Sequence, residues 1–129
     1  MLNLYGNGVN LTERTLDYLW GRQNVTINNI ANVDTPGFKS KYVTFENFLA
    51  KNIRAAQLKS ATGKSVERAI QSSFATVHTT TNESTRLDGN NVDMDQEQIE
   101  LVKTTYEYQM MVQSITHDFS RLSESVKTF

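Results

Sequence analysis

Residues 28–39 have the sequence Asn28-Asn29-Ile30-Ala31-Asn32-Val33-Asp34-Thr35-Pro36-Gly37-Phe38-Lys39, and this stretch decides the fold. An apolar pattern with helical spacing runs into it and stops at Pro36, the only proline in the chain. Proline lacks the N–H needed to continue a helix, and it pushes the preceding Thr35 toward an extended conformation. Gly37 tolerates the positive φ that a type II turn requires. We therefore predict a strongly specified helix exit.

The segment before this exit carries apolar residues at heptad spacing, which predicts a helix from about Val9 to Asn32. Thr12 can cap its start. Gln23 interrupts the apolar row with a polar group, which either sets the register of packing or lies at an edge. The row, of the kind that packs against other helices, comprises Val9, Leu16, Trp20, Ile27 and Ile30, with Leu19 beside it.

A second and longer helix is predicted near the C-terminus. Asp88-Gly89-Asn90-Asn91 is a turn signal, and Asp93 or Asp95 can serve as the helix N-cap. Gln98 follows Asp95 by three residues, which is a weak variant of a capping box. A helix of about 35 residues from this point is ~50 Å long.

Two apolar rows on this second helix are out of phase with each other, which predicts a slip in the packing frame and a broad apolar surface. The first helix is too short to cover both rows, so we expect the chain to assemble with partners. The earlier row is Ile99, Val102, Tyr106 and Met110, and the later row is Val112, Ile115, Phe119, Leu122, Val126 and Phe129.

The middle of the chain has weaker signals. Thr44 can cap a short helix with Phe45, Phe48, Leu49 and Ile53 on one face, and residues 61–65 have the composition of a flexible loop. Val66 and Ile70 extend a brief helical turn. Residues 72–81 are rich in β-branched side chains and predict a strand or an extended segment. A lone strand is unstable, so it must pair elsewhere, another copy being one option.

Charge is strongly segregated although the net charge of the chain is only -1. Residues 39–82 have a net charge of +5, and residues 83–129 have a net charge of -5. This asymmetry favours contacts between copies or segments, although a solvated basic face explains the cations equally well. The pI of about 6.1 argues against nucleic-acid binding.

Composition excludes several other classes. The chain has no cysteine, so disulfides and thiolate metal sites are absent, and no apolar run approaches the ~20 residues that span a bilayer. The N-terminal residues lack the pattern of a cleavable secretory signal. We expect three parts: an N-terminal helix with its exit turn (1–39), a basic middle segment (40–88) and a C-terminal helix (89–129).

No constellation of residues points to catalysis, a metal or a cofactor. His78 and His117 lie in different predicted elements without further ligands nearby. Residues 88–93 lack the ligand alternation of a calcium loop, and residues 61–65 lack the first glycine of a phosphate-binding loop. We therefore expect a protein that is not an enzyme.

Two motifs carry a family resemblance. Asn29-Ile30-Ala31-Asn32, followed by Thr35-Pro36-Gly37-Phe38-Lys39, resembles the N-terminal signature of the bacterial flagellar rod and hook family of axial proteins. Asn90-Asn91-Val92-Asp93-Met94-Asp95, followed by Tyr108-Gln109, resembles the C-terminal segment of that family. Phe38 stands where the family often has tyrosine. The middle segment has no matching motif, and the short length is most like that of a proximal rod member.

The resemblance implies a mainly α fold, in which long terminal helices pair as an antiparallel coiled coil around a small irregular middle with a short helix and a strand. It also implies a structural subunit that self-assembles into the rod, transmits motor torque and lines the export channel. The implied location is the basal-body rod outside the cytoplasmic membrane, reached without a cleavable signal peptide. A cytosolic helical-hairpin adaptor that binds one partner helix is the alternative.

Implied partners are other copies of the chain, neighbouring rod proteins of the FlgC type, the MS ring and its adaptor (FliF and FliE types) and the flagellar type III export apparatus, with no nucleic acid. The residues expected to form the turn motif for assembly are Asn29, Ile30, Ala31, Asn32, Thr35, Pro36, Gly37 and Phe38. Those expected to pack the helices are Leu16, Trp20, Ile27, Ile30, Val112, Ile115, Phe119, Leu122, Val126 and Phe129.

Overall fold

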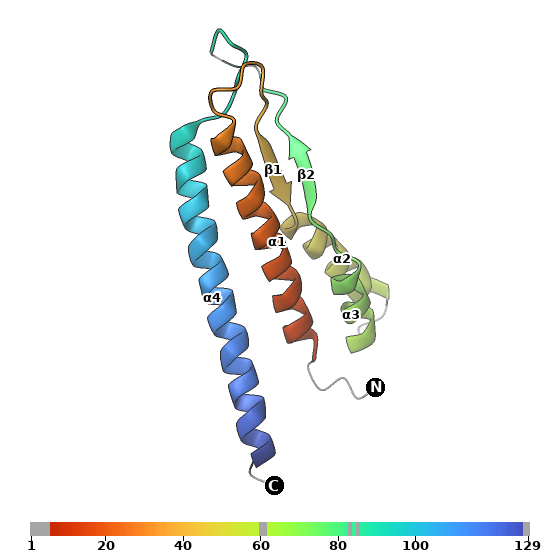
Figure 1. Ribbon diagram of the computed structural model, residues 1–129. Helices are drawn as coiled ribbons and strands as arrows, with labels where there is room; N and C mark the ends of the chain where they lie inside the picture. The colour runs from red at the N-terminus through yellow and green to blue at the C-terminus, as the bar shows by residue number, and fades with distance from the viewer. Residues whose placement is uncertain (1–5, 60–61, 83, 85, 128–129) are drawn as a thin grey trace.

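The computed structural model describes residues 6–59, 62–82, 84 and 86–127. Two long terminal helices lie side by side in opposite directions (Figure 1). A two-stranded antiparallel sheet and two shorter helices lie against the first of them. This confirms the expected mainly α fold with a small mixed middle segment. The elements are α1 (Gly6–Ala31), β1 (Lys41–Thr44), α2 (Glu46–Lys59), α3 (Gly63–Gln71), β2 (Thr76–Thr79) and α4 (Met94–Lys127).

α1 starts and ends close to the positions expected from the sequence. It begins at Gly6 rather than Val9, so Thr12 is not a cap but a buried residue inside the helix, where its hydroxyl donates to the carbonyl of Gly8 at 3.0 Å. The helix ends at Ala31, ahead of Pro36. Gly37 has φ 72°, which is the positive value that the turn after the helix requires.

The start of α4 settles which aspartate caps the helix. One carboxylate oxygen of Asp93 accepts hydrogen bonds from the amides of Asp95 at 3.0 Å and Gln96 at 3.3 Å. Asp93 is therefore the N-cap, and Asp95 lies inside the first turn, so the alternative capping box does not form.

The contact between α1 and α4 uses rows that differ from the predicted ones. On α4 one row of buried or half-buried residues alternates between spacings of three and four, and it consists of Leu101, Thr104, Tyr108, Met111 and Ile115. This row continues past residues 106–112 without the expected slip. Small residues at buried positions, Thr104 on α4 and Thr26 on α1, replace the larger apolar side chains expected there.

Several predicted packing residues therefore face solvent in the single chain. Trp20 is 62% exposed, and the whole earlier row of α4 lies outside the α1–α4 contact because it falls on the face opposite Thr104. The exposed large apolar residues of the two helices are Trp20, Ile27, Ile99, Val102, Tyr106, Met110, Val112, Phe119, Leu122 and Val126.

The predicted strand pairs within the chain rather than with another copy. β2 lies inside residues 72–81 and pairs antiparallel with β1, with Tyr42 opposite His78 and Val43 opposite Val77. The strand at β1 was not expected. Thr44, predicted as a helix cap, instead ends β1, where its hydroxyl lies 2.8 Å from the ring nitrogen Nε2 of His78.

The two short helices complete the middle segment. α2 begins at Glu46, just after the predicted cap, and its half-buried face includes Leu49 and Ile53. α3 buries Ala69 and Ile70, and it begins at Gly63, so the second half of the predicted loop 61–65 is the first turn of a helix. Both helices pack on each other, and α3 also packs on α1.

The core lies where α1, β1 and α4 meet. Tyr18 and Phe45 stack with ring centroids 5.1 Å apart, beside buried Leu19 and Val43. Half-buried residues from three helices pack against this cluster: Val25, Leu49, Tyr108 and Met111. The cluster therefore joins the middle segment to both terminal helices.

We expect Phe45→Ala to lower the free energy of unfolding by about 3 kcal/mol, because it removes a large side chain from a packed site and leaves a cavity. Phe45 is 3% exposed, whereas Phe48 on the outer face of α2 is 43% exposed, which makes Phe48→Ala the matched control. Urea unfolding followed by circular dichroism measures both. Equal losses for the two variants would contradict the placement of the core.

Candidate functional site

Two connecting segments meet at the end of the molecule where α1 ends and α4 begins (Figure 1). Residues 32–40 follow α1 and residues 86–93 precede α4, and we call them together the joint. The amide of Gly37 donates to the carbonyl of Asp88 at 2.8 Å, and the amide of Asn91 donates to the carbonyl of Phe38 at 3.3 Å. The joint therefore ties the two terminal helices together through backbone contacts.

Asn90 is the central residue of the joint and is fully buried. Its side-chain amide nitrogen donates to the carbonyls of Asn32, Val33 and Thr35, each at 2.9 Å. Its side-chain oxygen accepts from the amide of Val92 at 2.8 Å. One side chain thus bridges three carbonyls of the segment that follows α1 and orients the approach to α4.

Two glycines in the joint have backbone angles that other residues rarely adopt. Gly37 has φ 72° and Gly89 has φ 75°, and a Cβ added to Gly89 would make only an ordinary 3.7 Å contact with the Cα of Gly37, so the backbone angles rather than lack of space favour glycine here. Lys39 donates to the carbonyl of Gly89 at 2.8 Å, and Arg86 donates to the carbonyl of Val33 at 2.9 Å. These side chains cross between the two segments and close the joint from outside.

Asn29 connects three elements just below the joint. Its side-chain oxygen accepts from the amide of Lys41 at 2.9 Å, and its nitrogen donates to the carbonyl of Lys41 at 2.7 Å. The same nitrogen donates to Glu97 of α4 at 2.9 Å. This buried amide pairs with the backbone of β1 as a neighbouring strand would, and it also forms a hydrogen bond to α4.

A charged cluster lies between α1 and α4, farther from the joint than Asn29. The guanidinium of Arg22 lies 2.6 Å from Glu100, 3.7 Å from Glu46 and 3.9 Å from Glu107. It also lies 5.5 Å from the centroid of the Tyr18 ring. One cation from α1 therefore faces carboxylates from α2 and α4, so that three helices share a single charge centre.

The pKa values in this region reflect burial and hydrogen bonding. Burial raises the pKa of the Tyr18 hydroxyl, and its hydrogen bond to Glu46 at 2.7 Å adds to the rise. Burial opposes ionisation of Glu46, but hydrogen bonds from Tyr18 and the backbone, with the charge of Arg22, hold the pKa of that carboxyl below its usual value. Burial raises the pKa of Glu97 against the hydrogen bond from Asn29, and the nearby Glu100 and Asp93 add to the rise.

A groove of about 960 Å³ runs between the first turns of α4 and the hairpin, with α1 as its floor. Arg22 and Thr26 lie at the floor, and the walls include Glu97 on α4 and Lys41 on β1. Its lining is mostly polar. Among the described residues, no group of three or more His, Asp or Glu side chains is placed to hold a metal ion.

The structure divides the predicted turn motif into two sets. Asn29 is buried and Ile30, Asn32 and Phe38 are half-buried, whereas Ala31, Thr35, Pro36 and Gly37 lie on the surface of the joint. Asn90 was seen in the sequence as part of a turn signal and of the second family motif, but not as a buried connector, and Arg22 was not singled out. The adjacent pairs Asn28-Asn29 and Asn90-Asn91 at the two helix ends are the signal that indicates buried amides here.

The predicted helix-packing residues are likewise divided. Leu16, Ile30 and Ile115 are half-buried, and the remaining described members of the set are exposed in the single chain. Phe129 lies outside the described residues. The contacts of the exposed members with other molecules remain a prediction.

Known proteins are similar to this chain in the regions that form the joint and beyond them. A family model described as Flagella basal body rod protein matches residues 21–39, the second half of α1 and the first segment of the joint. The chain is 30% identical over 121 residues to the Bacillus subtilis flagellar basal body rod protein FlgB, covering 94% of each chain. It is 33% identical over 135 residues to FlgB of Borrelia hermsii, covering 98% of this chain and all of the other.

The chain belongs to the FlgB family of flagellar basal body rod proteins. FlgB of Escherichia coli strain K12 is 27% identical over 124 residues, with 90% of each chain covered. Family membership makes the chain a structural component of the flagellar basal-body rod that assembles with other rod components. None of the described helices has the length and apolar character needed to cross a membrane.

We expect Asn90→Ala to lower the free energy of unfolding by about 2–3 kcal/mol, because it removes a fully buried side chain together with all of its hydrogen bonds across the joint. The control is Asn24→Ala, an exposed asparagine on the middle of α1. Thermal unfolding followed by circular dichroism measures both variants. A change for Asn90→Ala no larger than for the control would contradict the central place of this amide.

We expect Glu97→Gln to stabilise the chain at neutral pH. The pKa of Glu97 is raised in the folded state, so its contribution to stability is greatest below the unfolded value and is lost as pH rises through the folded value. The glutamine oxygen still accepts from Asn29 and carries no buried charge.

Glu46→Gln is the control, and it should change stability at neutral pH in the opposite direction. The pKa of Glu46 is lowered, so its stabilising contribution is present above the unfolded value and is lost as pH falls through the folded value. Unfolding measured from about pH 4 to 7, which spans the usual carboxyl range, compares both variants with the parent. A loss of stability for Glu97→Gln at pH 7 would contradict the role of burial at this residue.

Proposed function

We propose that the chain is a self-assembling subunit of the proximal part of the flagellar rod, joined to neighbouring copies through its terminal helices. The observation that carries this proposal is the set of large apolar side chains left exposed on both helices after they have paired with each other. Exposed apolar rows of this extent are typical of interaction surfaces.

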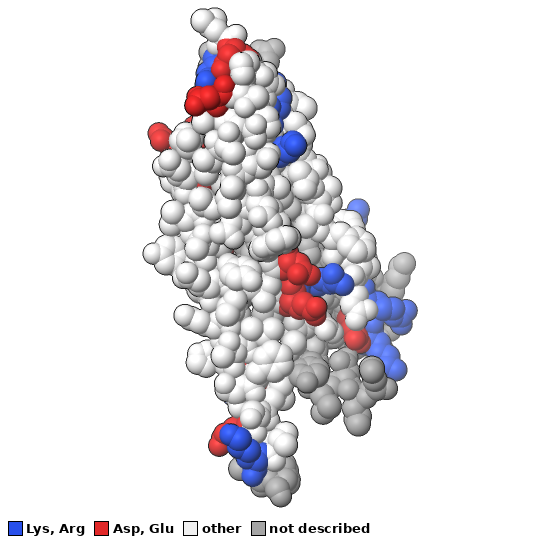
Figure 2. All heavy atoms as spheres, in the orientation of Figure 1, with Lys and Arg blue, Asp and Glu red and all other residues white. Residues whose placement is uncertain are grey.

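The distribution of charge supports the same proposal. Figure 2 shows a surface over much of α4 without charged side chains, with charged groups near both ends of the molecule and a further charged group over α1. The exposed row Ile99, Val102, Tyr106 and Met110 follows helical spacing along the outer face of α4. Asp95 precedes this row by one turn and Lys103 lies at its edge, so a second helix that packs along the row meets charged groups only at the border of the contact.

In this proposal residues 1–39 and 89–129 form the axial part of each subunit, and residues 40–88 form the middle part. The turn motif from Asn29 to Phe38 fixes the angle between the axial helices and the middle segment. The buried amides of the joint would keep that angle constant in every subunit, as transmission of motor torque requires. Axial helices stacked in this way would line the export channel.

The proposed partners are other copies of the chain, rod proteins of the FlgC type, the MS ring with its adaptor (FliF and FliE types), and the flagellar type III export apparatus, which the chain would use without a cleavable signal peptide. No partner in this proposal is a nucleic acid, and no catalysis is required.

We expect Trp20→Glu to reduce the amount of the chain in purified basal bodies by about tenfold or more, because a charge would be buried in the subunit interface. The same substitution should leave unfolding of the isolated chain nearly unchanged, since Trp20 is exposed there. Thr81→Glu, at an exposed position of the middle segment outside both helical rows, is the control and should be incorporated normally.

Normal incorporation of Trp20→Glu would contradict the proposed role of the α1 row. Recovery of the parent chain only from the cytosol, never from basal bodies, would overturn the rod function and favour a cytosolic helical-hairpin adaptor.

A further inference from the structure

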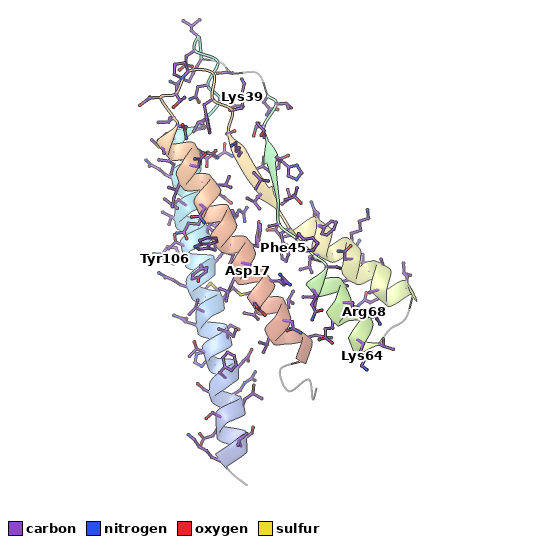
Figure 3. The ribbon with its side chains drawn as sticks, turned by 45° about the vertical axis from the view of Figure 1, so that its right-hand side comes forward. Asp17, Lys39, Phe45, Lys64, Arg68 and Tyr106 are labelled. Carbon is purple, nitrogen blue, oxygen red and sulfur yellow. The ribbon has the colours of Figure 1, made fainter. Side chains whose placement is uncertain are left out.

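The outer face of α2 carries cationic side chains that have no acidic partner within the described part of the chain. Lys51 and Arg54 are exposed and form no ion pair with any described residue. Figure 2 shows basic side chains gathered over α2 and α3, and Figure 3 places Lys64 and Arg68 on the neighbouring helix α3. Unpaired cations on one surface favour contact with an acidic partner.

The same face of α2 is hollowed. A shallow depression of about 450 Å³ is lined by Asn47, Ala50, Lys51, Arg54, Ala55 and Leu58. The alanines leave room for a side chain from another helix, and Leu58 beside them is 89% exposed. The small residues can receive an apolar side chain of a second helix, and the neighbouring cations can pair with an acidic side chain beside it.

The first turns of α4 present a face of that kind. Asp95, Ile99 and Val102 share one side of the helix, together with Gln98, because they are spaced by three and four residues. All four are exposed, Ile99 to 69%. Asp95 makes no ion pair with a described residue, and the helix cap is provided by Asp93, so the carboxylate of Asp95 is available.

These two faces are complementary but cannot meet within one chain. α4 packs along α1, while α2 packs on α3 far from the start of α4 (Figure 1). Contact between them therefore requires two copies. Since each copy has one face of each kind, the contact can repeat from copy to copy, as assembly of a rod requires, or close reciprocally into a two-fold pair.

We propose that the α2 face of one copy docks on the Asp95–Val102 face of α4 in a second copy. Lys51 and Arg54 face Asp95, and Ile99 enters the hollow beside Leu58. This inference rests on the proposed self-assembly and adds to it a contact between the middle segment and the axial helix. An anionic lipid surface suits this face less well, because alanines and one leucine offer little large apolar surface for insertion.

Cross-linking tests the contact directly, because the chain has no cysteine of its own. A copy with Ala55→Cys and a differently tagged copy with Gln98→Cys are produced together in flagellated cells, and basal bodies are purified and oxidised. The contact predicts a disulfide-linked dimer that carries both tags. Replacing Ala55→Cys by Asn24→Cys, on an exposed part of α1, is the control and should give about tenfold less dimer.

A charge exchange tests the ion pair. Arg54→Glu should reduce the cross-link about tenfold, and adding Asp95→Arg to the same chain should restore it, because every contact then has the reversed pair. Circular dichroism confirms that each variant is folded. Failure of the second substitution to restore the cross-link would overturn the pairing of Arg54 with Asp95.

The outcomes separate this inference from the proposed function. If the chain is found in basal bodies but the two cysteine variants form no cross-link, the docking is overturned and the rod function stays intact. Absence of the parent chain from basal bodies overturns the rod function itself. Binding to phosphatidylglycerol vesicles that Arg54→Glu abolishes, without any cross-link between copies, overturns the docking in favour of a membrane surface.

Discussion

The side-chain amide of Asn90 is the interaction on which the arrangement of the terminal helices depends. One fully buried side-chain amide, from the segment before α4, lies 2.9 Å from three carbonyls in the segment after α1. A different angle between the helices would take these carbonyls away and leave the buried amide without acceptors, which costs more than the hydrogen bonds themselves gain. The joint is therefore held in one geometry by polar groups rather than by apolar packing.

The apolar residues are used differently from those of a self-sufficient domain. The core of the single chain is small and centres on Tyr18 and Phe45, and threonines occupy buried positions on both long helices. The larger apolar side chains lie on the outer faces. A chain built in this way keeps its shape through the joint and the Arg22 cluster, and it leaves its strongest hydrophobic surfaces to contacts with other subunits of the rod.

Much of the fold is visible in the sequence because it depends on local signals. Pro36 and Gly37 mark the end of α1, and the aspartates after Gly89 mark the start of α4. Their antiparallel pairing was implied by the family resemblance, and the existence of both long helices follows from these signals and from apolar spacing. The face that each helix buries does not, because helical spacing alone cannot distinguish a row that packs inside the chain from a row left for another molecule.

The sequence by itself determined where the helices stop, how charge is divided along the chain, and that apolar surface exceeds what one chain can cover. These are local or compositional properties. Only the tertiary structure decided that Asn29 and Asn90 are buried connectors, that residues 41–44 form a strand, and that Arg22 faces three carboxylates. Each of these depends on residues distant in sequence, since an amide or a guanidinium acquires its role from the partners that folding places beside it.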